Sequence, residues 1–292
     1  MENNLSLAKV HCEPLFKLSE SMNHLDELNF AVVDVETTGL SAAYGERVCE
    51  VGIVRARGDA VLDTYQSLVN PQRLISPGAA RVNGLRDEDV SHAPLFAEIA
   101  DQVLEWIDGA LLVCHNAPFD LSFLDSELSR LGRSWQPAGV IDTLEIARRN
   151  YNFASNSLPN VAAVLGIQTP DAHRALGDAL TTFQVFRHFR CQLTRQGLIQ
   201  MQGLVREYRP AQHWAEEMIL PPSIQEALTG KREVEITYID QKGDETIRCI
   251  TPLSVQEMRG TVYLVAYCHL RQAERTFRLD RIVAIGRVEE QR

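Results

Sequence analysis

The sequence lacks long apolar runs, paired cysteines and an excess of basic charge. No apolar stretch approaches the roughly 20 residues that a membrane-spanning helix needs, so no membrane association is expected. Residues 1–20 show no basic segment followed by a continuous apolar one, so a secretory signal is not expected either. The six cysteines form no CxxC pair. This spacing predicts free thiols in a reducing cytoplasm rather than a zinc knuckle or a disulfide framework.

The charge that is present is unevenly distributed. The formal net charge is −10, which argues against a protein that coats nucleic acid by bulk electrostatics. Residues 221–292 carry 11 basic and 11 acidic side chains, so the whole acidic excess lies before them. We therefore expect an acidic catalytic part and a neutral C-terminal part. Any contact with nucleic acid must be local, with divalent metal supplying some of the positive charge.

The 292 residues predict about two domains. Apolar runs at 30–36, 47–57 and 63–70 predict an antiparallel meander, and the alternating helices and strands that follow indicate an α/β domain. After the Pro-Pro pair at 221–222, period-2 strands joined by short turns predict a small β-barrel. The expected organisation is an N-terminal arm (1–27), an α/β domain (28–191), a helical linker (192–221) and an all-β domain (222–292).

Four carboxylates and one histidine stand out in the α/β part. Asp34 and Glu36 are two apart in a buried strand, so both side chains leave the same face, where burial and repulsion disfavour them. Asp120 and Asp178 lie at expected helix starts, and His173 lies five residues before Asp178. Two divalent cations about 3.5–4 Å apart would neutralise such a cluster, in the arrangement used for in-line displacement at phosphorus. Oxygen ligands favour Mg²⁺ or Mn²⁺ over zinc.

Each of these patterns alone is common on ordinary protein surfaces. Their occurrence together, in order and on the expected elements, favours a catalytic site. The motifs "VVDVETTGL", "LVCHNAPFDLSFLDSEL" and "HRALGDALTTFQVF" resemble the three motifs of the DEDDh 3′-to-5′ exonucleases, in particular the epsilon-type proofreading enzymes. The resemblance covers about residues 28–190. It implies an RNase H-like fold with a mixed five-stranded sheet flanked by helices.

The resemblance also assigns roles to individual residues. Asp34, Glu36, Asp120 and Asp178 would bind the two cations, and His173 would be the general base that takes the proton of the attacking water. The residues expected to hold the terminal nucleotide are Thr37, Thr38, Leu40, Asn83 and Phe119. Leu40 would be a wedge against the base, and Phe119 is equally compatible with a core position. Asn83 stands in "VNGL" where these enzymes usually carry histidine, so substrate affinity or choice is expected to differ.

The C-terminal part resembles a WYL domain, usually an Sm- or SH3-like β-barrel that binds a ligand, often nucleic acid. The resemblance covers about residues 222–287 and includes "ITYID", "VYLVAYCHL" and "RTFRLDRI". The naming tripeptide is Val262-Tyr263-Leu264, without the leading tryptophan. Arginine forks fit phosphate and tyrosine rings offer stacking faces. The candidate contacts to a nucleotide or nucleic-acid ligand are Tyr238, Arg248, Tyr263, His269, Arg278 and Arg281, although some of these positions suit a barrel core equally well.

These features together predict a cytoplasmic, metal-dependent 3′-to-5′ exonuclease. It would hydrolyse the terminal phosphodiester of single-stranded 3′ ends, with DNA favoured, and release nucleoside 5′-monophosphates. The alternatives are an RNA- or oligonucleotide-trimming nuclease, a nucleic-acid-binding regulator with a vestigial nuclease fold, and a dedicated polymerase proofreading subunit. The full acid and base set counts against the second alternative. A folded domain in place of a polymerase-binding tail counts against the third.

Overall fold

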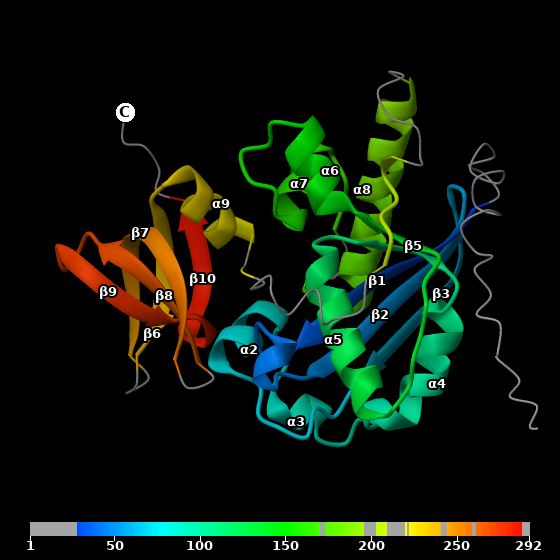
Figure 1. The fold of residues 1–292 in the computed structure, drawn as a ribbon, viewed down its shortest axis with the longest axis horizontal. Helices are drawn as coiled ribbons and strands as arrows, with labels where there is room; N and C mark the ends of the chain where they lie inside the picture. Colours follow the sequence, from blue (N-terminus) through cyan, green and yellow to red (C-terminus); the bar gives the residue numbers. More distant parts are fainter. Residues whose placement is uncertain are drawn as a thin grey trace, which may run out of the picture.

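The computed structural model describes residues 28–169, 173–195, 203–208, 220, 222–240, 244–258 and 261–287. The predicted N-terminal arm, residues 1–27, lies outside this part of the chain. The described residues form two bodies, each built on its own five-stranded sheet (Figure 1). Neither body contains a helix that is long and apolar enough to cross a membrane, among the residues that are described.

The first sheet is mixed and has the strand order β3-β2-β1-β4-β5. Its strands are β1 (Asn29–Thr37), β2 (Val48–Arg57), β3 (Ala60–Leu68), β4 (Leu111–Cys114) and β5 (Gly139–Asp142). The first three pair antiparallel, as the turn signals between them predict, and β4 and β5 add parallel to β1. This topology confirms the predicted α/β fold with its mixed five-stranded sheet.

Helices cover both faces of this sheet (Figure 1). One face packs against α4 (Phe96–Ile107) and α5 (Ala117–Arg130). The other packs against α6 (Thr143–Asn150), α7 (Leu158–Val164) and α8 (Ala175–Arg195). Strand β1 alternates between the two cores, because Ala31, Val33 and Val35 enter the first and Phe30 and Val32 the second.

Three short elements between the strands build one end of this domain. They are the 3₁₀ turn η2 (Ala42–Tyr44) and the helices α2 (Pro77–Asn83) and α3 (Asp87–Val90). Ser76 caps α2, because its Oγ accepts a hydrogen bond from the Ala79 backbone N–H at 3.2 Å. The Ser76 N–H in turn donates to the Thr38 carbonyl at 3.0 Å. Helix α2 is thereby held against the end of β1.

The second sheet is entirely antiparallel, with the order β10-β6-β7-β8-β9. It comprises β6 (Val234–Ile239), β7 (Glu245–Met258), β8 (Thr261–Cys268), β9 (Ala273–Arg278) and β10 (Ile282–Arg287), with the 3₁₀ turn η4 (Leu279–Arg281) before β10. Helix α9 (Pro222–Gly230) packs on it, and Ile224 and Ala227 enter its core. The antiparallel sheet confirms the predicted small β domain, although a helix, α9, stands at its start.

The region predicted as a helical linker is partly described. Helix α8 extends to Arg195, past the predicted domain end at 191. Residues 205–208 are not helical, and Arg206 pairs with Val140 of β5. Tyr208 is buried there and its hydroxyl donates a hydrogen bond to Asp125. This segment therefore packs on the first domain and is not a free connector.

Candidate active site

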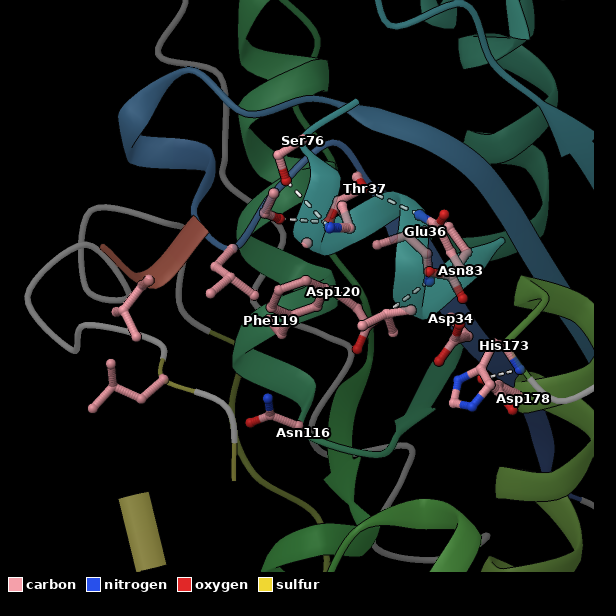
Figure 2. Close-up of a pocket in the computed structure, with 18 of the residues that line it drawn as sticks. Asp34, Glu36, Thr37, Ser76, Asn83, Asn116, Phe119, Asp120, His173 and Asp178 are labelled. Carbon is pink, nitrogen blue, oxygen red and sulfur yellow. Dashed lines mark hydrogen bonds between the residues drawn. The ribbon is translucent and has the colours of Figure 1, made fainter. Parts of the chain in front are cut away.

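Strand β1 places the first two carboxylates. Asp34 and Glu36 continue the alternation of Phe30 and Val32, so they point toward the α8 side of the sheet. Both are partly buried and line a cavity at the end of the strand (Figure 2). The register with β2 shifts between Glu36 and Thr37, which ends regular pairing beside the acids.

Helix α5 brings the third carboxylate to the same cavity. Asp120 lies in the first turn of α5, directly after β4, and it is only 3% exposed. Its Oδ1 accepts a hydrogen bond from the Val35 backbone N–H at 3.0 Å. That bond joins the start of α5 to the strand segment between Asp34 and Glu36. The position of Asp120 is therefore set by the backbone of β1.

Helix α8 supplies the fourth carboxylate and its approach depends on a glycine. Gly52 of β2 is the register partner of Asp34, and a Cβ atom at Gly52 would lie 2.3 Å from the Ala175 carbonyl carbon and the Leu176 nitrogen. The first turn of α8 thus passes directly over the strand. This close approach carries Asp178 to the two acids of β1.

His173 lies just before α8, at the edge of the acidic cluster (Figure 2). It is exposed and has a φ of 67°. Its backbone N–H donates to Asp178 Oδ2 at 3.2 Å. The loop conformation thus leaves the imidazole open to the cavity while the main chain stays bound to one of the acids.

A buried ion pair holds the same loop on the sheet. Glu50 of β2 is fully buried and accepts two hydrogen bonds from Arg174, at 2.7 and 3.0 Å. It also accepts from the Ala175 backbone N–H at 3.2 Å and from Gln66 Nε2 at 2.7 Å. A bidentate arginine pair fixes both distance and orientation. We did not identify Glu50 from the sequence, although a carboxylate inside the apolar run "RVCEVGIV" is a signal that could have found it.

The pKa values of the four carboxylates show that burial disfavours their charged forms. Burial raises the pKa of Asp34 well above its ordinary value, and the negative charges of Asp120 and Glu36 raise it further. Burial and the Asp178 charge do the same to the pKa of Glu36. The pKa of Asp120 and that of Asp178 are also raised, again mainly by burial. The positive charges of Arg174 and His173 lower the pKa values of Glu36 and Asp178, but by less than burial raises them.

The donor set fits divalent cations. Carboxylate oxygens of Asp34, Glu36 and Asp178 all lie within 4.8 Å of one another, and Asp120 lines the same cavity. Oxygen-only donors suit Mg²⁺ and Mn²⁺. Cations bound to these four residues would remove the repulsion that raises their pKa values.

The five residues predicted to hold the terminal nucleotide lie around one end of β1, but not all face the cavity. Thr37, Leu40, Asn83 and Phe119 line it. Thr38 is fully buried instead, and its hydroxyl donates to Glu46 Oε2 at 2.6 Å. Asn83 donates to the Thr37 carbonyl at 3.3 Å and accepts from the Leu85 N–H at 3.0 Å. These residues at the end of β1 are here called the lip of the cavity. Thr38 and Asn83 thus shape the lip through hydrogen bonds within the protein.

The six predicted ligand contacts of the C-terminal domain do not line this cavity. Tyr238 packs edge-on against Phe277, with ring centroids 5.2 Å apart, and Tyr263 lies opposite Arg278 in the β8–β9 register. Arg248 and Arg281 are partly exposed, on β7 and η4. His269 Nε2 forms a hydrogen bond with Thr251 Oγ1 at 2.8 Å and lies 3.4 Å from Glu233 Oε1.

His269 and Glu233 also lie near Cys249, so their donor atoms come within 4.8 Å of one another. These three side chains already contact one another and Thr251 within the protein. The C-terminal residues that do reach the cavity are apolar and were not predicted: Leu220, Leu279, Ile282 and Ile285.

Comparison with known proteins finds a family match in each part of the chain. The family described as Exonuclease (RNase_T) matches residues 31–186, which contain all four carboxylates and His173. The chain belongs to this exonuclease family. The WYL domain family matches residues 222–286. The resemblances drawn from the motifs are thus confirmed for both regions.

Curated relatives are much longer than this chain. "DNA polymerase III PolC-type" of Caldanaerobacter subterraneus subsp. tengcongensis is 38% identical over 161 residues, covering 55% of the chain and 11% of the relative. The Staphylococcus haemolyticus protein of the same name is 32% identical over 175 residues, covering 60% of the chain and 12% of the relative. The exonuclease thus spans about a tenth of these relatives.

Solved structures share the fold over most of the chain. E. coli exonuclease I in complex with a dT13 oligonucleotide matches with a TM-score of 0.54 and 15% identity, covering 91% of this chain and 67% of that one. A zinc-bound complex of the same enzyme with single-stranded DNA gives a TM-score of 0.52 and 19% identity, covering 82% and 54%. Identities this low establish a common fold and no more.

Proposed function

We propose that this protein is a 3′-to-5′ exonuclease that hydrolyses terminal phosphodiesters and releases nucleoside 5′-monophosphates. The observation that carries the proposal is the convergence of Asp34, Glu36, Asp120, Asp178 and His173 on one cavity. These residues come from three separate segments of the chain. Four carboxylates at such a place are costly for the fold, and a bound divalent pair accounts for them.

The four carboxylates would hold Mg²⁺ or Mn²⁺. The cations would supply Lewis-acid stabilisation of the charge that develops on the phosphoryl oxygens and the leaving 3′-oxygen. His173 would take the proton of the attacking water, and its exposed side chain at the cavity beside Asp178 supports this role. The Glu50–Arg174 pair keeps this loop on the sheet.

The lip of the cavity would bind the terminal nucleotide. Thr37 Oγ1 donates to the Gly39 carbonyl at 2.6 Å, which fixes the turn that presents Leu40. Leu40 and Phe119 would contact the sugar and base. Neither side chain offers a hydrogen bond to a base edge, so this part of the site would accept any base.

DNA is the favoured substrate. Support comes from the DNA polymerase names of the relatives and from the dT13 complex of exonuclease I. The four carboxylates would act on the phosphodiester of DNA and RNA alike, so they do not set this preference. The role proposed for the WYL domain is to bind nucleic acid or a regulatory ligand, and its apolar edge at the cavity supports a direct part in substrate binding.

A panel of 5′-end-labelled substrates tests the proposal. Single- and double-stranded DNA and RNA of the same sequence would be incubated with the full chain and Mg²⁺ or Mn²⁺. We expect stepwise shortening from the 3′ end, fastest on single-stranded DNA, with mononucleotides as the product. Faster shortening of RNA would establish the RNA-trimming alternative. Binding without shortening of any substrate would contradict the proposal and favour a regulator.

A further inference from the structure

The cavity that contains the carboxylates extends to the C-terminal domain. It has a volume of about 330 Å³, near the lower end of the range of small-ligand pockets. Leu220, Leu279, Ile282 and Ile285 form one side of it, here called the C-terminal wall. In Figure 2 the carboxylates lie on one side of Phe119, and the C-terminal segment, drawn in red, lies on the other. One continuous space thus joins an acidic end to an apolar end.

Contacts between the domains hold the C-terminal wall in place. Helix α2, next to the lip, packs against η4 and β10. Leu40 of the lip packs against the apolar core of the C-terminal domain. Arg81 of α2 forms an ion pair with Glu245 at 2.6 Å, although both side chains are nearly half exposed. A pair so exposed contributes little, so the apolar contact is the main link on this side.

Polar contacts join the domains on a second side. Glu226 of α9 accepts a hydrogen bond from Asn156 Nδ2 at 2.8 Å, and Arg148 of α6 lies 3.8 Å from the same carboxylate. Arg148 also donates to Gln225 at 3.1 Å. The C-terminal domain is therefore attached through α2 and through α6 with its following loop. Between these attachments its apolar edge faces the cavity.

The chemistry of the two ends identifies the ligand. A nucleotide has an anionic phosphate and a base whose faces are apolar. The phosphate suits the carboxylate end with its cations, and a face of the base suits the C-terminal wall. Leu279 and Ile282 are 4% and 9% exposed and Ile285 is partly buried, so the wall presents a small apolar surface to the cavity. A base placed against this surface would leave water. Aliphatic side chains read no base edge, so the wall contacts every base alike.

We infer that the C-terminal wall is part of the subsite for the unpaired 3′-terminal base. The WYL domain then completes the exonuclease site and is not a separate ligand sensor attached to it. The inference rests on the proposed function, because the carboxylate end must hold the terminal phosphodiester. A base that is paired in a duplex must leave its stack and its partner to enter, so the subsite favours single-stranded ends.

Ile285→Thr in the full chain tests the inference. Ile285 is partly buried, and threonine keeps the β-branched shape that strand β10 favours. The matched control is Ile247→Thr on β7, where the isoleucine is 60% exposed and outside the cavity. Each protein would be assayed on single-stranded DNA that ends in a normal nucleotide and on the same strand ending in an abasic residue.

We expect Ile285→Thr to lower kcat/KM on the normal end by about tenfold, the effect of a changed group in an apolar pocket. The rate on the abasic end should be unchanged, because that end has no base to contact the wall. The control should match the wild type on both. Equal losses on both ends, no change on either, or a rise on both would overturn the inference; a rise would make the domain an inhibitory cap. Absence of any hydrolysis by the wild type would instead refute the proposed function.

A measurement on an inactive chain removes the dependence on variant folding and on turnover. Single-stranded DNA ending in the photoreactive base 4-thiothymine would be bound to the full chain carrying Asp34→Asn and irradiated. The inference predicts a crosslink in the peptide that contains residues 279–285. Crosslinks confined to peptides of residues 28–195 would contradict it.

Discussion

The two ends of the cavity are built in opposite ways. At the acidic end, specific polar contacts fix two of the carboxylates. The Val35 N–H donates to Asp120 at 3.0 Å, and the His173 N–H donates to Asp178 at 3.2 Å. At the apolar end, the C-terminal wall contributes shape alone. We infer that hydrolysis at the acidic end requires fixed geometry, whereas binding of a base at the apolar end requires only an apolar surface. Activity should therefore respond to single-atom changes of side chains at the acidic end, and to changes in side-chain volume at the apolar end.

The largest effect expected from a residue that binds no metal is that of His173→Ala. Loss of a general base lowers kcat by about 10²–10⁴-fold. The carboxylates remain, so we expect Mn²⁺ to raise the melting temperature of the variant and of the wild type alike. His92→Ala is the matched control, because His92 is exposed and lies outside the cavity. Wild-type kcat in the His173 variant would remove it from the proposed chemistry.

A smaller effect is expected at Gly52, where the acidic end depends on close packing. In Gly52→Ala the new Cβ would meet backbone atoms of Ala175 and Leu176 at 2.3 Å. Helix α8 must then move, which costs about 1–3 kcal/mol of stability by overpacking and displaces Asp178. The melting temperature and kcat should both decrease in this variant. Gly286→Ala is the control, because its nearest neighbour would lie at 3.8 Å. An unaffected melting temperature and rate in Gly52→Ala would show that α8 does not depend on this contact.

The smallest of the three effects concerns the charge of Asp120 without metal. Folding raises its pKa, so the folded chain binds this proton more tightly than the unfolded chain does. The stability that this proton contributes is complete below the unfolded pKa of about 4 and is lost as pH rises toward the higher folded value. Asp120→Asn removes this pH-dependent loss of stability, and the amide oxygen of the new side chain can still accept the hydrogen bond from the Val35 N–H.

In a chelator, Asp120→Asn should therefore melt above the wild type at pH 7.5, by about 2–4 °C for each kcal/mol of relieved charge repulsion. The difference should shrink at pH 5, where the wild-type carboxyl is more protonated. A difference that is constant with pH would show that charge at Asp120 is not the cause.

The sequence was sufficient to predict the residues at the acidic end. Carboxylates inside apolar strands and at helix starts conflict with burial, so Asp34, Glu36, Asp120 and Asp178 stand out without a structure. The antiparallel meander could also be predicted, because its strand runs and turn signals are local, whereas the mixed five-stranded sheet was implied by the family resemblance. Glu50 was missed, although its position inside a buried strand carries the same kind of conflict.

The apolar end could not be predicted in the same way. Leu279, Ile282 and Ile285 have the spacing of ordinary core residues of a small β domain, and nothing local shows that they face another domain. Conversely, the arginines and tyrosines of the C-terminal domain have the chemistry of ligand contacts but lie outside the cavity. Thr38 illustrates a third case, since its motif position is right while its side chain turns inward to Glu46.

The central claim is that the carboxylate cluster carries hydrolysis from the 3′ end. The most direct measurement compares wild type, Asp34→Asn and the exposed-site control Asp63→Asn on 5′-labelled single-stranded DNA with Mn²⁺. The account predicts progressive shortening by the wild type and by Asp63→Asn, and a loss of at least about 10³-fold for Asp34→Asn, equivalent to several kcal/mol of transition-state stabilisation. Shortening by Asp34→Asn at the wild-type rate would contradict it.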